Sequence, residues 1–375
     1  MPRHFALFLL AIVSLLLVTC KSRHAQNTPP SSPAVYTVSL GKVAKKSIFR
    51  NDSMSIWGGS VVKDDAGIYH MYYSRWPRRL GWAWVTDSEI AHATAPTAFG
   101  PFTFQDVTLP RRGADYWDGW CTHNPTVRRY NGKYYLYYMG NTGDQRVTSI
   151  PGAENPNAHL NWSHRNLQRI GVAVADNPNG PWERFDEPLI DVSPDSNAID
   201  ALMTSNPSIT QLIDGSYLLI YKGVAQKKRM PFGGPVAHGV AVSNSPTGPF
   251  YKQAGVEVFT IEGDDFPAED PFIWHHRGAY RAIVKDMRGI FTEAGRSLAL
   301  FNSDDGLDWT LSEKPLLSDT QIFWEDGSIT DVDHLERPQL YVENGEPLML
   351  VCAADTLDGN GVRQSFNVQI PVIIK

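Results

Sequence analysis

Strands with alternating apolar and polar positions recur along the chain after its N-terminal segment. The clearest copies begin at His123, Ser205, Glu269 and Glu336, and each contains a polar pair, a proline, an apolar stretch, a turn glycine and a second, aromatic-rich strand. A degenerate copy, in which serine replaces the proline, begins at Gly58. Period-two alternation with turn glycines at matching places predicts pairs of antiparallel strands.

A second phrase follows each copy and completes a four-stranded unit. It is clearest as GVAVADNPNGPW at residues 171–182 and GVAVSNSPTGPF at residues 239–250. Each reads as a third strand, a turn that ends in Gly-Pro, and an aromatic residue that opens a fourth strand. Five such units predict an all-β, five-bladed β-propeller with four antiparallel strands per blade. A long β-sandwich is the alternative, but it does not account for five matched copies.

The N-terminal segment has the pattern of an export signal. Residues 1–20 contain a basic start and an apolar run that ends at Cys20, which predicts a signal peptide of the lipoprotein type with Cys20 as the lipidated residue. Thr19 is larger than the residue usual before such a cysteine, so cleavage to a soluble secreted form is the alternative. We expect residues 21–45 to be a flexible tether and residues 46–375 to form one propeller domain. The protein is therefore expected outside the cytoplasm, as a bacterial periplasmic or outer-membrane lipoprotein or as a secreted protein.

Composition narrows the classes of partner. The formal net charge is −6, and because acidic and basic residues are interspersed, nothing favours nucleic acid or an anionic membrane surface. Contact with a membrane is expected only through the lipid anchor. Cys121 and Cys352 lie in apolar strands, which favours buried thiols over a disulfide or a metal site. The sequence has no metal-binding motif with suitable spacing, so no metal or other cofactor is predicted.

The polar pair before each proline is the best candidate site. Because the pair recurs once per unit on the innermost strand, the five pairs should form a ring at the mouth of the central channel. The pairs are Gly58-Gly59, His123-Asn124, Ser205-Asn206, Glu269-Asp270 and Glu336-Arg337. A long insertion at residues 141–169 is expected to form a surface loop at the rim of such a site.

The carboxyl groups of this ring suit the hydrolysis of a glycosidic bond. That reaction commonly uses one protonated and one ionised carboxyl group, and Glu269, Asp270 and Glu336 supply carboxyls from neighbouring units. Crowded carboxyls also shift one another's pKa values apart, as separate acid and base roles require. We predict Glu269 or Asp270, together with Glu336, as the catalytic carboxyls. The alternative is that these acids pair with nearby cations and only tie the blades together.

Other side chains near the ring are predicted substrate contacts. Amides, imidazoles and cations can bind sugar hydroxyls or an anionic substituent, and indoles can stack on a sugar face. The predicted contacts are Arg75, Trp117, Asp118, His123, Asn124, Asn206, Lys222, Lys285, His334 and Arg337. Salt bridges between blades are the alternative for the cations, and packing between blades is the alternative for Trp117.

The repeated phrase resembles that of a known group of enzymes. A polar or acidic residue, Pro, an apolar strand, Asn/Asp-Gly and Tyr-Tyr-Leu-Tyr-Tyr, followed by a Gly-Pro-Trp turn, is similar to the five-bladed glycoside hydrolases of family 43 and their relatives in families 32, 62, 68, 117 and 130. The resemblance covers essentially all of the chain after residue 50. It implies a propeller that hydrolyses an oligosaccharide or polysaccharide, and calcium in the central channel is conceivable on this ground alone.

The catalytic residues of family 43 do not carry over to this chain. The resemblance implies an Asp before the first-blade proline, an Asp in the second blade and a Glu in the third, where this chain has Gly59, Asn124 and Asn206. Its ring acids lie in the fourth and fifth units. The sequence therefore predicts a glycoside hydrolase with rearranged carboxyls, acting on oligosaccharides derived from plant or algal polysaccharides. A non-catalytic carbohydrate-binding surface lipoprotein and a propeller that binds other proteins stay open as alternatives.

Overall fold

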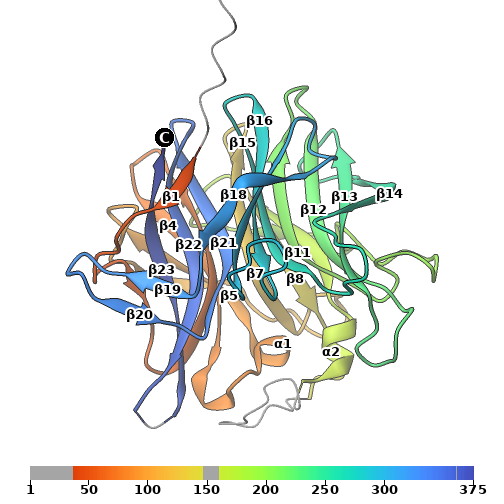
Figure 1. Ribbon diagram of the computed structural model, residues 1–375. Coiled ribbons are helices and arrows are strands. Elements are labelled where there is room, and N and C mark those ends of the chain that lie inside the picture. The colour runs from red at the N-terminus through yellow and green to blue at the C-terminus, as the bar shows by residue number, and fades with distance from the viewer. Residues whose placement is uncertain (1–36, 147–159, 360) are drawn as a thin grey trace, which may run out of the picture. The chain divides into compact units, whose positions relative to one another are not determined.

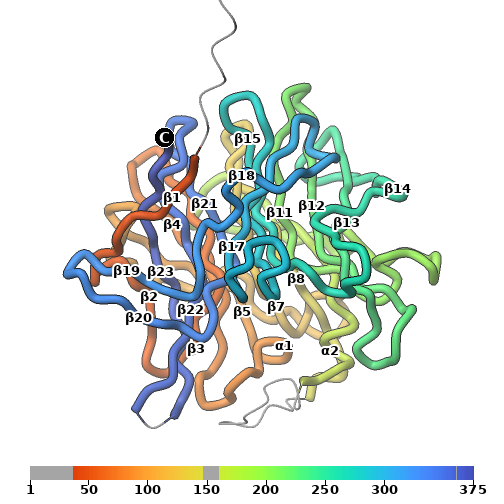
Figure 2. The backbone as a smooth tube through the Cα atoms, in the orientation of Figure 1, coloured from red at the N-terminus to blue at the C-terminus, as the bar shows by residue number. Residues whose placement is uncertain are grey.

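Five antiparallel sheets of four strands form the blades of a β-propeller. The computed structural model describes residues 37–146, 160–359 and 361–375. Figure 1 shows the strands, and Figure 2 follows the same chain as a tube. In the first four blades the strands follow one another along the chain, and each pairs with the next. The predicted five-bladed propeller is confirmed, and the β-sandwich alternative is wrong.

The blades have these strands, from the innermost outward. The first blade contains β3 (Met54–Lys63), β4 (Tyr69–Pro77), β5 (Glu89–Ala95) and β6 (Thr103–Leu109). The second contains β7 (Cys121–Tyr130), β8 (Lys133–Asn141), β9 (Arg169–Ala175) and β10 (Glu183–Arg184). The third contains β11 (Met203–Gln211), β12 (Tyr217–Val224), β13 (Val236–Ser243) and β14 (Tyr251–Val258). The fourth contains β15 (Ala268–His276), β16 (Ala279–Asp286), β17 (Ser297–Ser303) and β18 (Thr310–Ser318).

The fifth blade joins the two ends of the described chain. It contains β21 (His334–Glu343), β22 (Glu346–Leu357) and β23 (Arg363–Ile374), and its outer edge is made by β1 (Val38–Leu40) and β2 (Ile48–Phe49). Both N-terminal strands pair antiparallel with β23. The ring of blades is thus closed by hydrogen bonds between the first and last strands, which cover the edge of β23 from Asn367 to Ile374. A separate hairpin, β19 (Gln321–Phe323) and β20 (Ile329–Asp331), precedes the fifth blade.

This closure corrects the expected N-terminal boundary. Residues 38–40 form a strand and Val43 is buried in the core, so the prediction of a flexible tether as far as residue 45 is wrong for this part. The predicted signal peptide and the predicted lipidation site Cys20 lie outside the described residues. Among the residues that the structure describes, no helix is long and apolar enough to cross a membrane.

The core consists of one apolar cluster between each pair of neighbouring blades. The strand that reads Tyr-Tyr-Leu-Tyr-Tyr explains how the clusters arise. Tyr134, Leu136 and Tyr138 face the first blade, whereas Tyr135 and Tyr137 face the third, because successive side chains of a strand point to opposite faces of its sheet. Cys121 and Cys352 are buried free thiols, as predicted.

The loops between the second and third strands of the blades build the rim of the central channel. In the first blade this loop contains the short helices η1 (Arg78–Leu80) and α1 (Trp84–Asp87), and in the second it contains α2 (Trp162–Asn166). Figure 1 shows α1 and α2 at the same end of the molecule. The described part of the long insertion therefore lies at the rim of the channel, as expected.

Removal of the closing strands should destabilise the propeller. A chain that begins after residue 50 loses the buried side chains of Val43 and Phe49, each worth about 1.5–3 kcal/mol, and exposes the edge of β23. We expect its melting temperature to be ~5–10 °C below that of a matched chain beginning at Thr37. Equal melting temperatures, measured by differential scanning calorimetry, would contradict this account of closure.

Candidate active site

A bulge at the same place in all five innermost strands creates the ring. Pairing with the second strand shifts register between Trp57 and Ser60 in the first blade, and between His123 and Thr126 in the second. The other three blades have the same shift. One residue within each bulge has a positive φ of 51–55°, and these residues are Gly58, Asn124, Asn206, Asp270 and Arg337. A bulge re-aims side chains at a strand end, which is why the ring can face the channel.

The register corrects the predicted pair of the first blade. Gly58 has the positive φ that Asn124 has in the second blade, so Trp57-Gly58 is the pair and Gly59 takes the place of the proline. The expected pair Gly58-Gly59 was therefore one residue out of register. The position that the resemblance gives to a catalytic Asp is Gly58, which has no carboxylate either.

The positive-φ residues form a hydrogen-bonded belt across the channel. Asn124 Nδ2 donates to Asn206 Oδ1 (2.9 Å), and Asn206 Nδ2 donates to Asp270 Oδ1 (2.6 Å). Arg337 Nη1 donates to the same Asp270 oxygen (3.4 Å), while its Nη2 donates to the carbonyl of Asn124 (3.2 Å). All four side chains are buried. The belt is therefore the floor of the site, and Arg337 is its only cation.

Gly58 completes the belt by having no side chain. A Cβ at this position would lie 3.3 Å from Asn124 Oδ1 and 3.6 Å from Arg337 Cβ. A longer side chain would need the space that the arginine crosses on its way to Asn124. The absence of a side chain at Gly58 in the first blade thus leaves room for the long side chain of Arg337 in the fifth.

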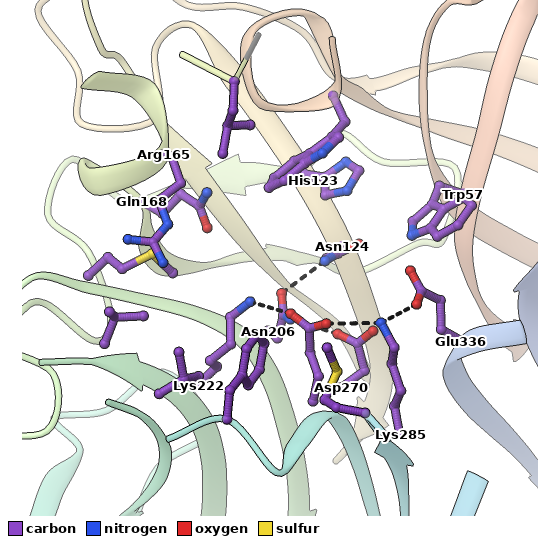
Figure 3. A pocket seen from close by; sticks show the side chains of 18 of the residues that line it. Trp57, His123, Asn124, Arg165, Gln168, Asn206, Lys222, Asp270, Lys285 and Glu336 are labelled. Carbon is purple, nitrogen blue, oxygen red and sulfur yellow. Dashed lines mark hydrogen bonds and ion pairs between the residues drawn. The ribbon is translucent and has the colours of Figure 1, made fainter. Parts of the chain in front are cut away.

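A cavity of about 360 Å³ lies above the belt. Figure 3 shows charged side chains at its floor, with Trp57 and His123 above them. Its aromatic lining consists of Trp57, Trp76, Trp82, Trp84, Trp162, Phe232 and Phe266. Planar aromatic walls around a polar floor suit a ligand with apolar faces and many hydroxyl groups.

A partly buried ion cluster connects three blades at the floor of the cavity. Glu269 accepts hydrogen bonds from Lys222 Nζ (2.6 Å) and Lys285 Nζ (3.1 Å). Lys285 also forms an ion pair with Glu336. One ammonium group thus bridges a carboxylate of the fourth blade and one of the fifth, as the dashed lines in Figure 3 mark. These are the interblade salt bridges that the sequence left as the alternative for the lysines.

The surroundings of Glu269 and Asp270 shift the pKa values of these two adjacent carboxyls in opposite directions. Burial, together with the charge of Glu269, raises the pKa of Asp270 to about 6 despite the nearby Arg337. Burial would also raise the pKa of Glu269, but Lys222 and Lys285 outweigh it and hold this pKa below its ordinary value. Burial disfavours the charge of Lys285, yet Glu336 and Glu269 raise its pKa above the ordinary one. Near pH 6 the site therefore contains an ionised Glu269 beside an Asp270 that can hold a proton.

Two histidines line the cavity on different sides. His123 contacts Ser88 Oγ (2.7 Å) and stacks on Trp84, and burial with the charges of Arg337 and Lys222 lowers its pKa well below the ordinary value. His123 is therefore neutral. His334 Nδ1 lies 2.9 Å from a carboxylate oxygen of buried Asp355, so its Nε2 is the nitrogen left to face Arg296 Nη1 at 3.3 Å.

Nine of the predicted site residues line this one cavity. They are His123, Asn124, Asn206, Lys222, Glu269, Asp270, Lys285, His334 and Glu336. Arg337 lies in the belt below, and Arg75 forms an ion pair with Glu89 at 2.9 Å. Neither of these arginines lines the cavity.

Asp118 and Trp117 lie away from the cavity, contrary to the expected substrate contact. The carboxylate of Asp118 is buried and accepts hydrogen bonds from Arg112 Nε (2.6 Å) and Tyr138 Oη (2.6 Å). Trp117 stacks on Tyr138 and packs against the cluster between the first and second blades. This loop precedes β7 in sequence, but its side chains turn toward the outer strands, and packing between blades is the alternative that the sequence left open for Trp117.

The sequence did not point to most of the cavity walls. Trp82, Trp84, Trp162, Arg165 and Gln168 lie on loops between second and third strands. The signal that could have found them is the GWAWVTD segment at residues 81–87, where two indoles sit on a loop. Aromatic residues on the loops between second and third strands, considered together with the innermost strands, would have pointed to these cavity walls.

The belt does not fit a calcium ion in the central channel. Calcium prefers six to eight oxygen ligands. The belt offers one carboxylate, that of Asp270, which already accepts hydrogen bonds from Asn206 and Arg337, together with two amide groups and the guanidinium of Arg337. Among the residues that the structure describes, no group of three or more His, Cys, Asp and Glu side chains is placed to hold a metal.

The comparisons with known proteins agree with the fold. No family model matches the chain, and no curated protein sequence matches it. The structure of Zg3597, a family 117 glycoside hydrolase of Zobellia galactanivorans, is similar with a TM-score of 0.61 and 16% identity, covering 90% of each protein. Several of the solved structures that this protein resembles are glycoside hydrolases.

Two further glycoside hydrolase structures are also similar to this protein. A thermostable family 43 glycoside hydrolase has a TM-score of 0.54 and 16% identity, covering 87% of this protein and 95% of the other. The arabinanase Arb43A of Bacillus subtilis has a TM-score of 0.51 and 18% identity, covering 84% and 94%. At these identities the likeness shows the five-bladed fold and nothing of the substrate.

Arg337 should matter for stability in a way that Arg75 does not. Arg337→Gln leaves Asp270 buried without its cation, which should cost about 3–5 kcal/mol of unfolding free energy. Arg75→Gln removes a partly exposed ion pair and should cost less than about 1 kcal/mol. Urea unfolding at neutral pH measures both, and equal losses would contradict the structural role of the belt.

Proposed function

We propose that this protein is an exported glycoside hydrolase that cleaves a glycosidic bond in oligosaccharides derived from plant or algal polysaccharides. The observation that carries the proposal is the cavity floor, where three carboxyls with different surroundings meet below aromatic walls. Hydrolysis of this bond needs one carboxyl that gives a proton and one that stays ionised. Asp270, Glu269 and Glu336 offer that combination.

Asp270 is the proposed proton donor. Its pKa of about 6 lets it hold a proton at mildly acidic pH, while one of its oxygens remains outside the bonds from Asn206 and Arg337. A carboxyl kept partly neutral by burial is the usual form of a glycosidase acid. It would protonate the oxygen of the leaving sugar.

Glu336 is the proposed ionised carboxylate that activates water or attacks the sugar. It shares one lysine with Glu269, whereas Glu269 is held by two lysines. Glu336 thus keeps more of its oxygens for substrate. Glu269 is proposed to act through Lys222 and Lys285, keeping the cluster ordered and the pKa of Asp270 raised.

Export is proposed from the N-terminal sequence. The apolar run that ends at Cys20 has the pattern of a lipoprotein signal, and the propeller begins only after residue 36. Enzymes that degrade external polysaccharides must meet their substrate outside the cytoplasm. Periplasmic, outer-membrane and secreted locations all satisfy this condition.

A non-catalytic carbohydrate-binding propeller is the second candidate. The observation that favours it is that all three carboxyls have cationic partners: Glu269 and Glu336 share Lys285, and Asp270 pairs with Arg337. Fully paired acids would bind sugar hydroxyls without transferring a proton. Both candidate functions predict that the protein binds an oligosaccharide, but only the hydrolase is expected to cleave it.

Glu336→Gln should abolish hydrolysis while the protein stays folded. We expect turnover of a cleaved oligosaccharide to fall by at least about 100- to 10,000-fold, because a carboxylate of the reaction is lost. The screen uses a panel of neutral and acidic plant and algal oligosaccharides and measures released reducing ends.

The matched control for this variant is Glu343→Gln. Glu343 lies on the same strand, β21, where it pairs with Lys63 outside the cavity, so its turnover should stay within about twofold of the parent. Binding without any turnover by the parent protein would favour the second candidate instead.

The pH dependence of kcat/KM should follow Asp270. The donor must be protonated, so activity is expected below pH ~6 and should fall about tenfold per pH unit above it. In Glu269→Gln this limb should move to lower pH, because the negative charge that raises the pKa of Asp270 is removed. An alkaline limb that does not move would argue against Asp270 as the donor.

A further inference from the structure

Arg165 is a buried cation of the cavity that has no carboxylate partner among the described residues. Lys222 and Lys285 also line the cavity, but both form ion pairs with Glu269. Arg165 is only 7% exposed and forms no salt bridge with any acid that the structure describes. A buried charge is costly unless it is paired, so this guanidinium has capacity for an anion.

The described neighbours of Arg165 hold its position through Nη1 and provide no acceptor for its Nε and Nη2 groups. Its Nη1 donates to the carbonyl of Phe232 (2.7 Å) and to Asn166 Oδ1 (2.9 Å). The guanidinium also lies 4.8 Å from the ring centre of Phe232 and 5.8 Å from that of Trp162. Neutral acceptors and aromatic rings orient the fork without neutralising it. An arginine held in this way can donate two parallel hydrogen bonds to the oxygens of a carboxylate or a sulfate group.

Gln168 adds an amide donor to the same part of the cavity. Its side chain is 2% exposed, and its Nε2 has no hydrogen-bond partner in the described part of the chain. A buried amide donor without an acceptor is costly, and here it lines a cavity in which a ligand oxygen could accept its hydrogen bond. Figure 3 draws Arg165 and Gln168 on the left of the cavity, with Trp57 and Glu336 on the right.

The balance of charge over the whole cavity points the same way. Its cations are Lys222, Lys285, Arg165 and Arg296, and its acids are Glu269, Asp270 and Glu336. Asp270 has its own partner in the belt, Arg337. Arg296 is exposed to solvent, so Arg165 is the buried cation of the described lining that an anionic group of the sugar would neutralise.

We propose that the cavity binds an acidic sugar whose carboxylate or sulfate group contacts Arg165 and Gln168. This inference rests on the proposed carbohydrate function and names the class of sugar. Arg165 and Gln168 would then determine specificity, and the carboxyls at the floor would meet the glycosidic bond. Binding of such a sugar should weaken as ionic strength rises, because the contact is an ion pair.

Calorimetric titration of the full chain with paired oligosaccharides tests the proposal. One set carries hexuronic acids and is compared with its carboxyl-reduced form, and the other carries sulfate esters and is compared with its desulfated form. The acidic member of at least one pair should bind at least about 10-fold more tightly. The pair that shows this preference distinguishes carboxylate from sulfate.

Variants separate recognition of the anion from a structural role of the arginine. Arg165→Gln should weaken binding of the acidic sugar about 10- to 100-fold and leave its neutral counterpart unchanged, and Arg165→Lys should restore part of the difference. Arg129→Gln is the matched control, since Arg129 pairs with Asp65 and does not line the cavity. It should bind both sugars as the parent does.

The results of these titrations distinguish a failure of the acidic-sugar inference from a failure of the proposed hydrolysis. Equal weakening of both sugars by Arg165→Gln, or a preference of the parent for the neutral members, would overturn the acidic-sugar inference while turnover of a neutral sugar would still support the hydrolase. Preferential binding of an acidic sugar without any turnover would support the inference and count against hydrolysis.

Discussion

The ammonium group of Lys285 lies between the carboxylates of Glu269 and Glu336, and the site depends on that contact. Without it, two partly buried acids on neighbouring blades would repel each other at the cavity floor. With it, the fourth and fifth blades are joined where the proposed chemistry occurs. The same cluster keeps Glu269 ionised, and the charge of Glu269 in turn helps to raise the pKa of Asp270.

The belt below this cluster shows how a repeated backbone feature can serve different purposes in each blade. Every innermost strand has the same bulge and a residue with positive φ, a conformation that glycine, asparagine and aspartate adopt more readily than other residues. The fifth blade instead places Arg337 there, and the empty space at Gly58 accommodates it. The floor is therefore stabilised by an internal cation, and the residues above it are left for a ligand.

The sequence predicted the architecture because the repeated phrase reflects local strand and turn chemistry. It predicted that Glu269, Asp270 and Glu336 lie close together because they belong to the polar pair that recurs once per unit at a fixed place. It misplaced the first pair, since Gly58-Gly59-Ser60 has no proline to fix the register. It placed Asp118 at the site because closeness in sequence does not reveal that the side chain turns toward Arg112 and Tyr138. The walls of the cavity come from loops of unequal length whose meeting depends on closure of the ring.

The most direct test of the account is a crystal structure of the Glu336→Gln protein soaked with an oligosaccharide that the parent protein cleaves or binds. The account predicts a glycosidic oxygen within hydrogen-bond distance of Asp270, a sugar ring against the tryptophan wall, and an anionic substituent on Arg165. A sugar bound on the outer face of the blades, with the cavity floor untouched, would contradict it.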